Sequence, residues 1–237
     1  MRLDIYLTEN SLCKSRTAAQ SLIKSGGVSL NGIPCTKPSQ EVGESDTVDI
    51  IGEQLRYVGR GGLKLEAALD KFALDITGVE CIDIGSSTGG FTDCMLQHGA
   101  AKVWAVDVGR DQLDESLRRD PRVVSMEQTD IRTAELPQVD FIGTDVSFIS
   151  LKLILPHIYR LLKSGGRAAV LIKPQFEAGR PNLSKKGIVR DEKVRLRIRD
   201  EIAEFAQGCG FSVIGTETSP ITGGDGNTEY LMCLEKR

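Results

Sequence analysis

The chain has 237 residues, of which 40% are hydrophobic and 27% are charged, and it carries a formal net charge of -3. This composition is typical of a globular protein, and it excludes a collagen-like repeat, a coiled-coil rod and a long disordered tail. No apolar run approaches the roughly 20 residues of a membrane-spanning helix. Charged residues interrupt the first ten positions, whereas a secretory signal has an uninterrupted apolar stretch. The sequence therefore predicts a cytoplasmic protein without membrane contact.

The use of cysteine and histidine argues against a metal site. The six cysteines are scattered without a C-x-x-C pair, and His98 and His157 are the only histidines. A structural zinc site needs clustered soft ligands, so we expect no bound metal. We expect free thiols in place of disulfides, because several cysteines lie inside apolar, strand-like runs.

Basic residues concentrate in two stretches of the chain. Residues 10–40 contain four Lys or Arg and no acidic residue, and residues 151–199 contain thirteen against three acidic ones. Such segregation suits a protein that presents a basic face to a polyanion, although a solvated helix surface explains lysine and arginine runs equally well. Charge alone therefore leaves nucleic-acid binding open.

The first fifty residues predict a small α+β unit. Residues 2–7 have apolar side chains at helical spacing, and a second helix is predicted at 15–24, with a serine cap at its start and the glycines 26–27 after its end. Residues 28–34 predict a hairpin around an Asn-Gly turn, and 48–51 supply a closing strand.

The order of "RLDIYL", "SRTAAQSLIKSGGVSLNG" and "VDI" resembles the RNA-binding module of small-subunit ribosomal protein four, the S-four-type domain. The resemblance implies that basic side chains of the two helices and the hairpin meet an RNA backbone, for which point charges suffice. A solvated pair of amphipathic helices with ordinary surface lysines is the alternative. The RNA-binding candidates are Arg2, Lys14, Arg16, Lys24, Lys37 and, in the join that follows, Arg60.

A glycine-rich join at 52–62 marks a boundary, and we expect domains at 1–58 and 59–237. In the second domain strands and helices alternate, which predicts a Rossmann-like, mostly parallel sheet covered on both faces, with the last strand antiparallel. Strands are predicted at 79–84, 102–108, 122–126, 139–145, 167–173, 211–216 and 229–234, and helices at 63–72, 89–98, 112–118, 150–162 and 191–207.

A glycine-rich turn joins the first of these strands to its helix. Its glycines allow close approach of a ligand, and the helix start offers unpaired N–H groups. The turn lacks the glycine at residue 87 that a dinucleotide fingerprint needs, and no P-loop lysine follows. A plain tight connection between strand and helix is the alternative. The turn comprises Asp83, Gly85, Ser86, Ser87, Thr88, Gly89, Gly90 and Phe91.

Two further carboxylates follow the next two strands. Asp107 ends the second strand, 24 residues after Asp83, where an acidic side chain can accept hydrogen bonds from ribose hydroxyls. Asp130 is placed to meet an adenine amino group. A ribose acceptor without a pyrophosphate fingerprint favours S-adenosylmethionine over NAD, because a sulfonium cofactor needs no phosphate cradle.

From Arg60 onward the chain resembles the haemolysin-like TlyA proteins and, more distantly, the FtsJ ribose methyltransferases. The likeness rests on "DIGSSTGGFTD", "TDVSFISL", "LIKPQFE" and "GGDGNTEYL". It implies methylation of the 2'-hydroxyl of a ribose, of cytidine, in ribosomal RNA or ribosomal subunits, with S-adenosylmethionine as cofactor. It also implies a catalytic set of Lys64, Asp145, Lys173 and Glu229, with Asp145 contributing to the cofactor site as well.

Topology supports this grouping independently. Asp145 and Lys173 end parallel strands, and Glu229 begins a last strand that we expect to be antiparallel, so all three face one edge of the sheet. Two amines and two carboxylates in one cleft shift each other's proton affinity. We expect Lys173 to contact the 2'-hydroxyl, Asp145 and Glu229 to hold the ammonium groups, and Lys64 to orient the ribose.

Several alternatives remain. Base amino-methylation typically shows Asp or Asn before Pro-Pro and an aromatic residue, where this chain has Asp145-Val146-Ser147-Phe148. A methyltransferase fold without turnover would act as an RNA- or ribosome-binding factor, and the traditional family name suggests a membrane-active haemolysin. The sequence leaves the oligomeric state open between a monomer and a weak dimer.

Overall fold

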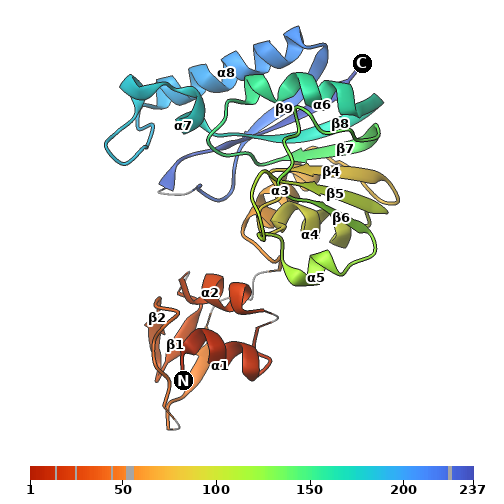
Figure 1. The fold of residues 1–237 in the computed structure, drawn as a ribbon. Coiled ribbons are helices and arrows are strands. Elements are labelled where there is room, and N and C mark those ends of the chain that lie inside the picture. The colour runs from red at the N-terminus through yellow and green to blue at the C-terminus, as the bar shows by residue number, and fades with distance from the viewer. Residues whose placement is uncertain (14, 25, 44, 52–55, 224–225) are drawn as a thin grey trace. The chain divides into compact units, whose positions relative to one another are not determined.

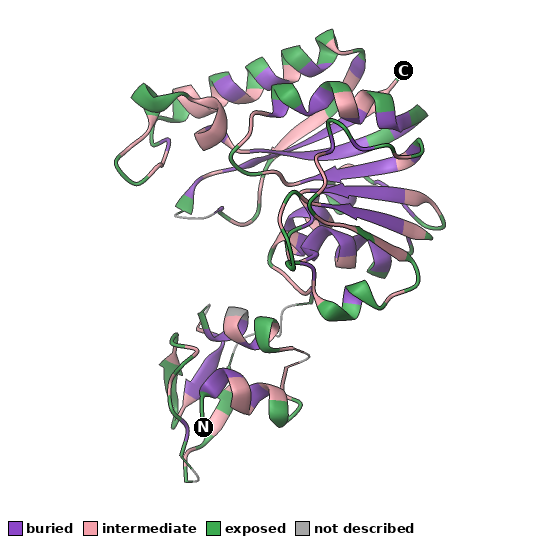
Figure 2. Ribbon diagram, viewed as in Figure 1, coloured by how far each residue is buried: buried purple, intermediate pink, exposed green. Residues whose placement is uncertain are grey.

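The structure, a computed structural model, describes residues 1–13, 15–24, 26–43, 45–51, 56–223 and 226–237. The chain divides into two compact units, Met1–Arg60 and Gly61–Arg237. Each unit has its own buried apolar cluster, visible as purple segments in Figure 2.

The N-terminal unit has the predicted α+β character. Helices α1 (Leu3–Glu9) and α2 (Arg16–Lys24) precede a three-stranded antiparallel sheet of order β2-β1-β3. The backbone N–H of Ala18 donates to Ser15 Oγ at 3.2 Å, which is the predicted cap of α2. The strands are β1 (Val28–Leu30), β2 (Ile33–Cys35) and β3 (Val48–Ile50), and the core comprises Leu3, Leu7, Ala19, Leu22, Ile23, Val28 and Val42.

The Asn-Gly turn behaves as the sequence predicts. Asn31 and Gly32 have φ angles of 53° and 77°, so both adopt the left-handed conformation that a type I' hairpin turn requires. The side-chain oxygen of Asn31 also accepts the backbone N–H of Thr47, at 2.9 Å, which ties the turn to the approach of β3.

The C-terminal unit is built on a seven-stranded sheet of order β6-β5-β4-β7-β8-β10-β9 (Figure 1). The first five of these strands are parallel, and β10 is antiparallel to both of its neighbours, as predicted for the last strand. The strands are β4 (Glu80–Ile84), β5 (Lys102–Val106), β6 (Val123–Met126), β7 (Val139–Thr144), β8 (Leu162–Ile172), β9 (Phe211–Thr218) and β10 (Tyr230–Lys236).

Helices cover both faces of this sheet. Figure 1 shows α3 and α4 on one face and α6 and α8 on the other. The apolar side chains of the strands pack against both layers, which is why β4, β7 and the 168–172 half of β8 are buried almost throughout. The helices are α3 (Gly61–Lys71), α4 (Gly90–Gln97), α5 (Glu115–Arg118), α6 (Leu155–Leu161), α7 (Pro174–Glu177) and α8 (Glu192–Gly208), with short 3-10 helices η1 (Leu151–Leu153) and η2 (Arg180–Asn182).

Two helices are shorter than predicted. The helix expected at 150–162 is split into η1 and α6, because Pro156 has no N–H to continue a helix and instead lies in the first turn of α6. The helix expected at 112–118 begins only at Glu115. The backbone N–H groups of Gln112 and Leu113 are bound by the Glu127 carboxylate.

Gly89 closes the turn before α4 in a left-handed conformation, with two leucine methyl groups where a side chain would begin. Its φ angle is 97°, and a Cβ there would lie 2.2 Å from Leu117 Cδ1 and 2.8 Å from Leu113 Cδ1. The glycine therefore permits both the left-handed backbone and the close packing of the turn on α5.

We predict that Gly89→Ala lowers the stability of the C-terminal unit by about 3 kcal/mol, or about 9 °C in Tm, from backbone strain together with overpacking. Gly165→Ala is the matched control, since its φ is 75° but no atom lies within 4 Å of its Cβ position. Thermal unfolding followed by circular dichroism measures both variants. Equal decreases in Tm in the two variants would show that overpacking against Leu117 contributes nothing to the destabilisation.

Candidate active site

The register of the sheet places three of the predicted catalytic residues at one edge. Thr144 of β7 pairs with Val170 of β8, and Tyr230 of β10 pairs with Ile172 of β8. Asp145, Lys173 and Glu229 are the residues immediately beyond these strand ends. Helix α3, which packs against β8 and β10, brings Lys64 to the same edge.

The four side chains form two linked ion pairs. Lys64 Nζ lies 2.6 Å from Glu229 Oε2 and 3.8 Å from Asp145 Oδ2, and Lys173 Nζ lies 2.5 Å from Asp145 Oδ1. The Lys64–Glu229 pair is nearly inaccessible, with 9% and 2% of the side chains exposed, whereas Lys173 and Asp145 are 11% and 17% exposed. Asp145 bridges the two lysines, and the Lys173–Asp145 pair is the more open to a substrate.

Lys173 has a second partner that the sequence analysis did not assign. Its ammonium donates to Ser147 Oγ at 2.9 Å, so the amine is held from two sides by the segment that follows β7. In the same segment Phe148 is 92% exposed at a φ of 62°, and its ring lies 5.1 Å from that of Phe176. A bulky residue in the left-handed region is strained, and such strain gathers at functional sites.

The glycine-rich turn packs directly on the Asp145 backbone. Gly85 has a φ of 83°, and a Cβ there would lie 2.7 Å from the Asp145 carbonyl oxygen. The backbone N–H groups of Gly85 and Ser86 donate to the Val106 carbonyl, at 2.8 and 3.2 Å. The turn therefore joins the ends of β5 and β7.

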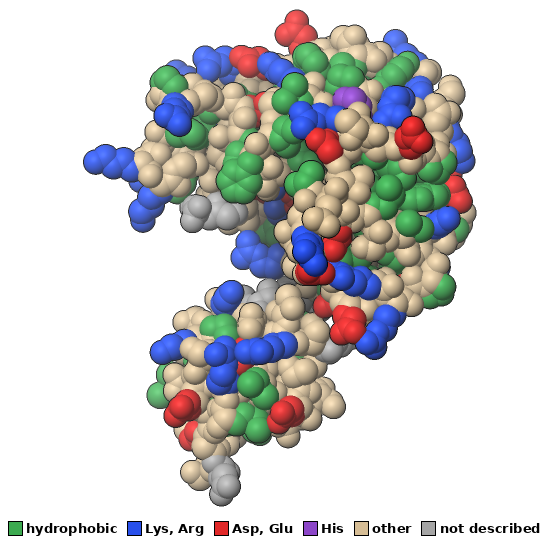
Figure 3. All heavy atoms as spheres, viewed as in Figure 1, with side chains coloured by type: hydrophobic (Ala, Val, Ile, Leu, Met, Phe, Trp, Pro, Cys, Tyr) green, Lys and Arg blue, Asp and Glu red, His purple; other side chains and the backbone are tan. Residues whose placement is uncertain are grey.

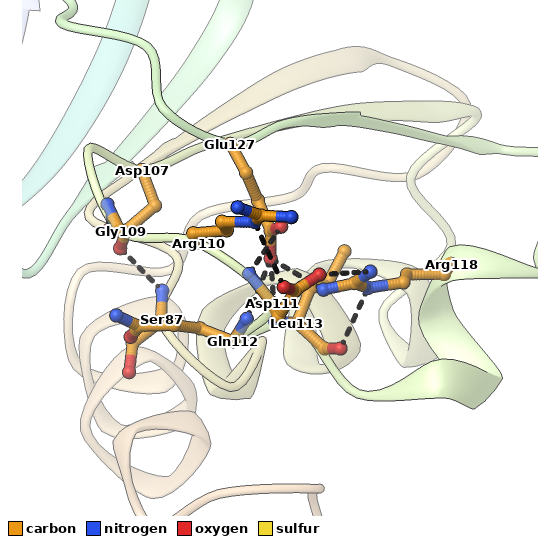
Figure 4. A network of polar contacts seen from close by, with 9 residues as sticks. All are labelled: Ser87, Asp107, Gly109, Arg110, Asp111, Gln112, Leu113, Arg118 and Glu127. Carbon is orange, nitrogen blue, oxygen red and sulfur yellow. Dashed lines mark hydrogen bonds and ion pairs between the residues drawn. The ribbon is translucent and has the colours of Figure 1, made fainter.

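Ser87 and Asp107 meet at the outer side of this turn. Figure 4 shows the backbone N–H of Ser87 donating to Asp107 Oδ2, at 2.8 Å, while the Gly109 N–H donates to Oδ1 at 2.7 Å. Ser87 is exposed and adopts a φ of 47°. The Asp107 carboxylate thus keeps lone pairs for a ribose hydroxyl while its position is fixed by the turn.

The other predicted turn residues are placed around these contacts. Thr88 is half-buried and its carbonyl accepts the Asp114 N–H at 3.1 Å. Gly90 and Phe91 are buried in the first turn of α4. Residue 87 is a serine where the dinucleotide fingerprint has glycine, and no lysine or arginine lies in residues 85–91. The turn and Asp107 therefore suit a nucleoside that carries a sulfonium side chain better than a dinucleotide.

Glu127 organises the loop beyond Asp107, and the sequence analysis missed it. Figure 4 shows its carboxylate accepting the N–H groups of Asp111, Gln112 and Leu113, at 2.8 to 3.0 Å, and pairing with Arg118 at 2.8 Å. The N–H of Leu113 and its neighbours hold the pKa of Glu127 below its usual range. A lone glutamate after a strand carries no sequence signal for such a role.

Asp83 lies beneath the turn and is wholly buried. Its Oδ2 accepts both the backbone N–H and the hydroxyl of Thr92, at 2.9 and 2.6 Å, which fixes the start of α4. Its Oδ1 has no hydrogen-bond partner among the described residues. Its contact with a cofactor stays a prediction, and the contacts seen here act on the turn.

Asp130 is engaged by a single neighbour. Arg132 donates to both of its oxygens, at distances from 2.6 to 3.0 Å, and this pairing lowers the pKa of Asp130 to about 2. The carboxylate is one-third exposed and ionised at neutral pH. Its contact with an adenine amino group stays a prediction.

In the N-terminal unit two of the RNA-binding candidates share one buried carboxylate. Asp4 accepts from Arg2 at 2.9 and 3.0 Å, from Arg16 at 3.0 Å and from Gln20 at 2.8 Å. The bond from Arg2, with those from Gln20 and Arg16, holds the pKa of Asp4 well below its usual range. Both guanidinium groups stay about half exposed, so their planar forks are fixed yet accessible.

The remaining RNA-binding candidates are solvent-facing where the structure describes them. Lys24, Lys37 and Arg60 are exposed, and Lys14 lies outside the described residues.

In the part of the chain that the structure describes, no group of three or more His, Cys, Asp or Glu is placed to hold a metal ion. No helix in the same residues has the length and apolar character needed to cross a membrane.

The mostly parallel sheet with an antiparallel inserted strand and the glycine-rich turn after β4 are those of an S-adenosylmethionine-dependent methyltransferase, and the family comparison shows that class. The chain belongs to the FtsJ-like methyltransferase family, whose model matches residues 57–236, and an S4 domain matches residues 1–48.

Relatives extend over nearly the whole chain. The rRNA methyltransferase YqxC proposed for Bacillus subtilis is 47% identical, covering 98% of this chain and 85% of its own length. The 16S/23S rRNA (cytidine-2'-O)-methyltransferase TlyA of Mycobacterium tuberculosis is 40% identical, covering 98% and 89%. A solved structure from Streptococcus thermophilus, described as a proposed hemolysin, is 46% identical with a TM-score of 0.79, covering 100% of this chain and 88% of that one.

Burial raises the pKa of Asp83 to about 7, and this shift makes stability depend on pH. Between about pH 4 and pH 7 the folded protein keeps a proton that the unfolded chain releases, so stability falls as the pH rises through this window. We therefore compare how much the free energy of unfolding decreases between pH 5 and pH 8 in two proteins. We predict that this decrease is about 3 kcal/mol smaller in Asp83→Asn than in the unsubstituted protein.

Urea denaturation at the two pH values measures this difference. Asp130→Asn is the control, because its carboxylate stays ionised throughout this range and should leave the pH dependence unchanged. The same pH dependence in Asp83→Asn and the unsubstituted protein would contradict the assignment.

Proposed function

We propose that this protein transfers a methyl group from S-adenosylmethionine to the 2'-hydroxyl of a cytidine ribose in ribosomal RNA. The observation that carries the proposal is the convergence of Lys64, Asp145, Lys173 and Glu229 at the sheet edge beside the turn after β4. A relative that matches 98% of this chain is a 16S/23S rRNA (cytidine-2'-O)-methyltransferase, which supports this substrate. A ribosomal RNA substrate would place the protein in the cytoplasm.

Residues of the turn would hold the cofactor. The backbone of Gly85 to Gly89 borders it, and the Asp107 carboxylate, already fixed by two backbone N–H groups, is free to accept from ribose hydroxyls. When bound, S-adenosylmethionine supplies an electrophilic methyl group and leaves as a thioether. The chain's own task is to place the attacking oxygen in line and to take up its proton.

Lys173 is the group that contacts the 2'-oxygen in this proposal. Asp145 and Ser147 hold two sides of its amine, which leaves a third hydrogen-bonding position for the substrate. To act as proton acceptor the Lys173 ammonium would first pass one proton to the Asp145 carboxylate, 2.5 Å away. The neutral amine would then take the 2'-hydroxyl proton as the oxygen attacks the methyl carbon, and the same contact positions the attacking oxygen.

Lys64 and Glu229 form the inner support of the site. Their 2.6 Å pair is buried, and Lys64 also reaches toward Asp145. Lys64 therefore holds the Asp145 carboxylate in place, while Glu229 balances the buried ammonium. A contact of Lys64 with the ribose stays a prediction. Removing Glu229 would leave Lys64 without its nearest carboxylate.

We predict that Lys173→Ala lowers methyl transfer to ribosomal RNA at least about 10³-fold, because it removes both the proton acceptor and the positioning contact. Transfer of tritium from labelled cofactor into ribosomal RNA measures the rate, and calorimetry should find cofactor affinity within about twofold. Lys163→Ala is the control, because Lys163 pairs with Asp140 at the opposite edge of the sheet.

Methylation that survives Lys173→Ala at the original rate would contradict the role of this amine. An unsubstituted protein that binds ribosomal RNA and cofactor but transfers no label would instead identify a non-catalytic RNA-binding factor.

The S4 domain is proposed to dock the RNA through Arg2, Arg16, Lys24 and Lys37, together with Arg60 and Lys14. We predict that the double variant Arg16→Gln, Lys24→Gln weakens binding of a ribosomal RNA fragment and reduces the slope of log affinity against log salt by about 1.5, because two phosphate contacts are lost. The double variant Lys71→Gln, Lys163→Gln removes the same charge from ion-paired surface lysines of the other unit. Equal slopes of log affinity against log salt in the two double variants would show that Arg16 and Lys24 do not contact the RNA.

A further inference from the structure

A second basic surface lies in the methyltransferase unit itself, on the segment that joins α7 to α8. Residues 178–190 contain four cations and no acidic residue, and Lys193 follows in the first turn of α8. Figure 3 shows Lys and Arg side chains projecting where Figure 1 places the loop beside α7. We name this the 178–190 basic segment; its cations are Arg180, Lys185, Lys186 and Arg190, all exposed.

These cations differ from most others on the unit because they are not ion-paired, although the exposed Asp191 and Glu192 follow Arg190 in the chain. None of their side chains forms an ion pair with any described residue, nor does that of Lys193. Elsewhere on this unit Arg122, Arg132 and Arg167 pair with carboxylates at 2.6 to 2.9 Å. Like charges within one Debye length, about 10 Å at 0.1 M salt, repel each other, so this surface is complementary to an anion with several charges.

The root of the segment is held to the active-site edge. Glu177, which ends α7, accepts the Ser150 hydroxyl at 2.6 Å and the Leu151 N–H at 2.7 Å. Ser150 belongs to the stretch that begins at Asp145 and carries Ser147. The base of the basic segment is thereby fixed to the stretch that also carries the two partners of the Lys173 amine, Asp145 and Ser147.

The far end of the segment is held to the other side of the same edge. Val189 is buried, and its N–H is directed at Asn227 Oδ1 at 3.4 Å, while Asn227 Nδ2 is directed at the Gly187 carbonyl at 3.4 Å. Asn227 lies two residues before Glu229. A turn closed by Ser184, which accepts the Ile188 N–H at 3.0 Å, completes the fold of this segment.

We propose that the 178–190 basic segment binds the phosphodiester backbone of the substrate RNA beside the ribose that is methylated. The inference rests on the proposed function and deepens it. Because the segment is fixed at both ends to catalytic stretches, a phosphate bound there is held in register with Lys173, and exposed point charges of this kind position a backbone without reading its sequence.

The test compares two charge-neutralised variants in the full chain. One carries Arg180→Gln, Lys185→Gln, Lys186→Gln and Arg190→Gln, and a milder one carries only Lys185→Gln and Lys186→Gln. Binding of a ribosomal RNA fragment is measured over a range of salt concentrations, methyl transfer is measured at limiting and saturating RNA, and cofactor affinity is measured by calorimetry. The control, Lys163→Gln with Arg167→Gln, removes two positive charges at the opposite edge of the sheet.

We expect the fourfold variant to bind RNA about tenfold more weakly, with a salt slope smaller by about 3, and the milder variant to lose about half of that slope. Methyl transfer should decline at limiting RNA and recover at saturating RNA, with cofactor affinity unchanged, since the residues that face the cofactor are untouched. The control should match the unsubstituted protein.

Affinity and salt slope equal to those of the control would overturn this inference while leaving the proposed function intact. A decline in methyl transfer that persists at saturating RNA, with unchanged RNA affinity, would also overturn it. If the unsubstituted protein neither bound nor methylated ribosomal RNA, the proposed function itself would fail.

Discussion

The site depends on one electrostatic constraint: a lysine ammonium that has lost most of its water needs a carboxylate beside it. Removing one partner of a buried ion pair costs about 3–5 kcal/mol, because the other charge is left unsolvated. Lys64 and Glu229 are 165 residues apart in the chain and meet at 2.6 Å. Their pairing therefore requires that α3, β8 and β10 all reach their final positions.

The same constraint links the cofactor turn to the reacting amine. Gly85 packs against the Asp145 carbonyl, and the carboxylate of Asp145 binds the amine of Lys173. A shift of the turn would move the Asp145 backbone, and with it the partner of that amine. The glycine thus acts on catalysis through packing, without any side chain of its own.

Much of this arrangement follows from local patterns. Alternating strands and helices predicted the sheet, and the parallel order placed Asp145 and Lys173 at a common edge, because successive parallel strands end on the same side. The expected antiparallel last strand correctly brought Glu229 to that edge. Serine and glycine signals likewise gave the cap of α2 and the hairpin turn of the S4 domain.

What the patterns did not predict is decided by packing between distant segments. Which carboxylate meets which lysine depends on how α3 packs on the sheet. Glu127 binds N–H groups 14 to 16 residues earlier, and Glu177 binds Ser150, 27 residues earlier. Contacts over such separations produce no periodic sequence pattern from which they could be predicted. The burial of Asp83 cannot be predicted from the local sequence either, because an aspartate at a strand end has the same sequence context whether it faces solvent or the core.

The position of β10 has a consequence for the folding of the nascent chain during synthesis. Strand β9 is synthesised before β10 but has no other neighbour in the sheet, since β10 lies between it and β8. A nascent chain that reaches only Thr218 therefore exposes an unpaired β8 edge and a solitary β9, which are features that favour aggregation or chaperone capture. Because Glu229 immediately precedes β10, such a chain also lacks the carboxylate that neutralises Lys64, so catalytic competence arises only with the last strand.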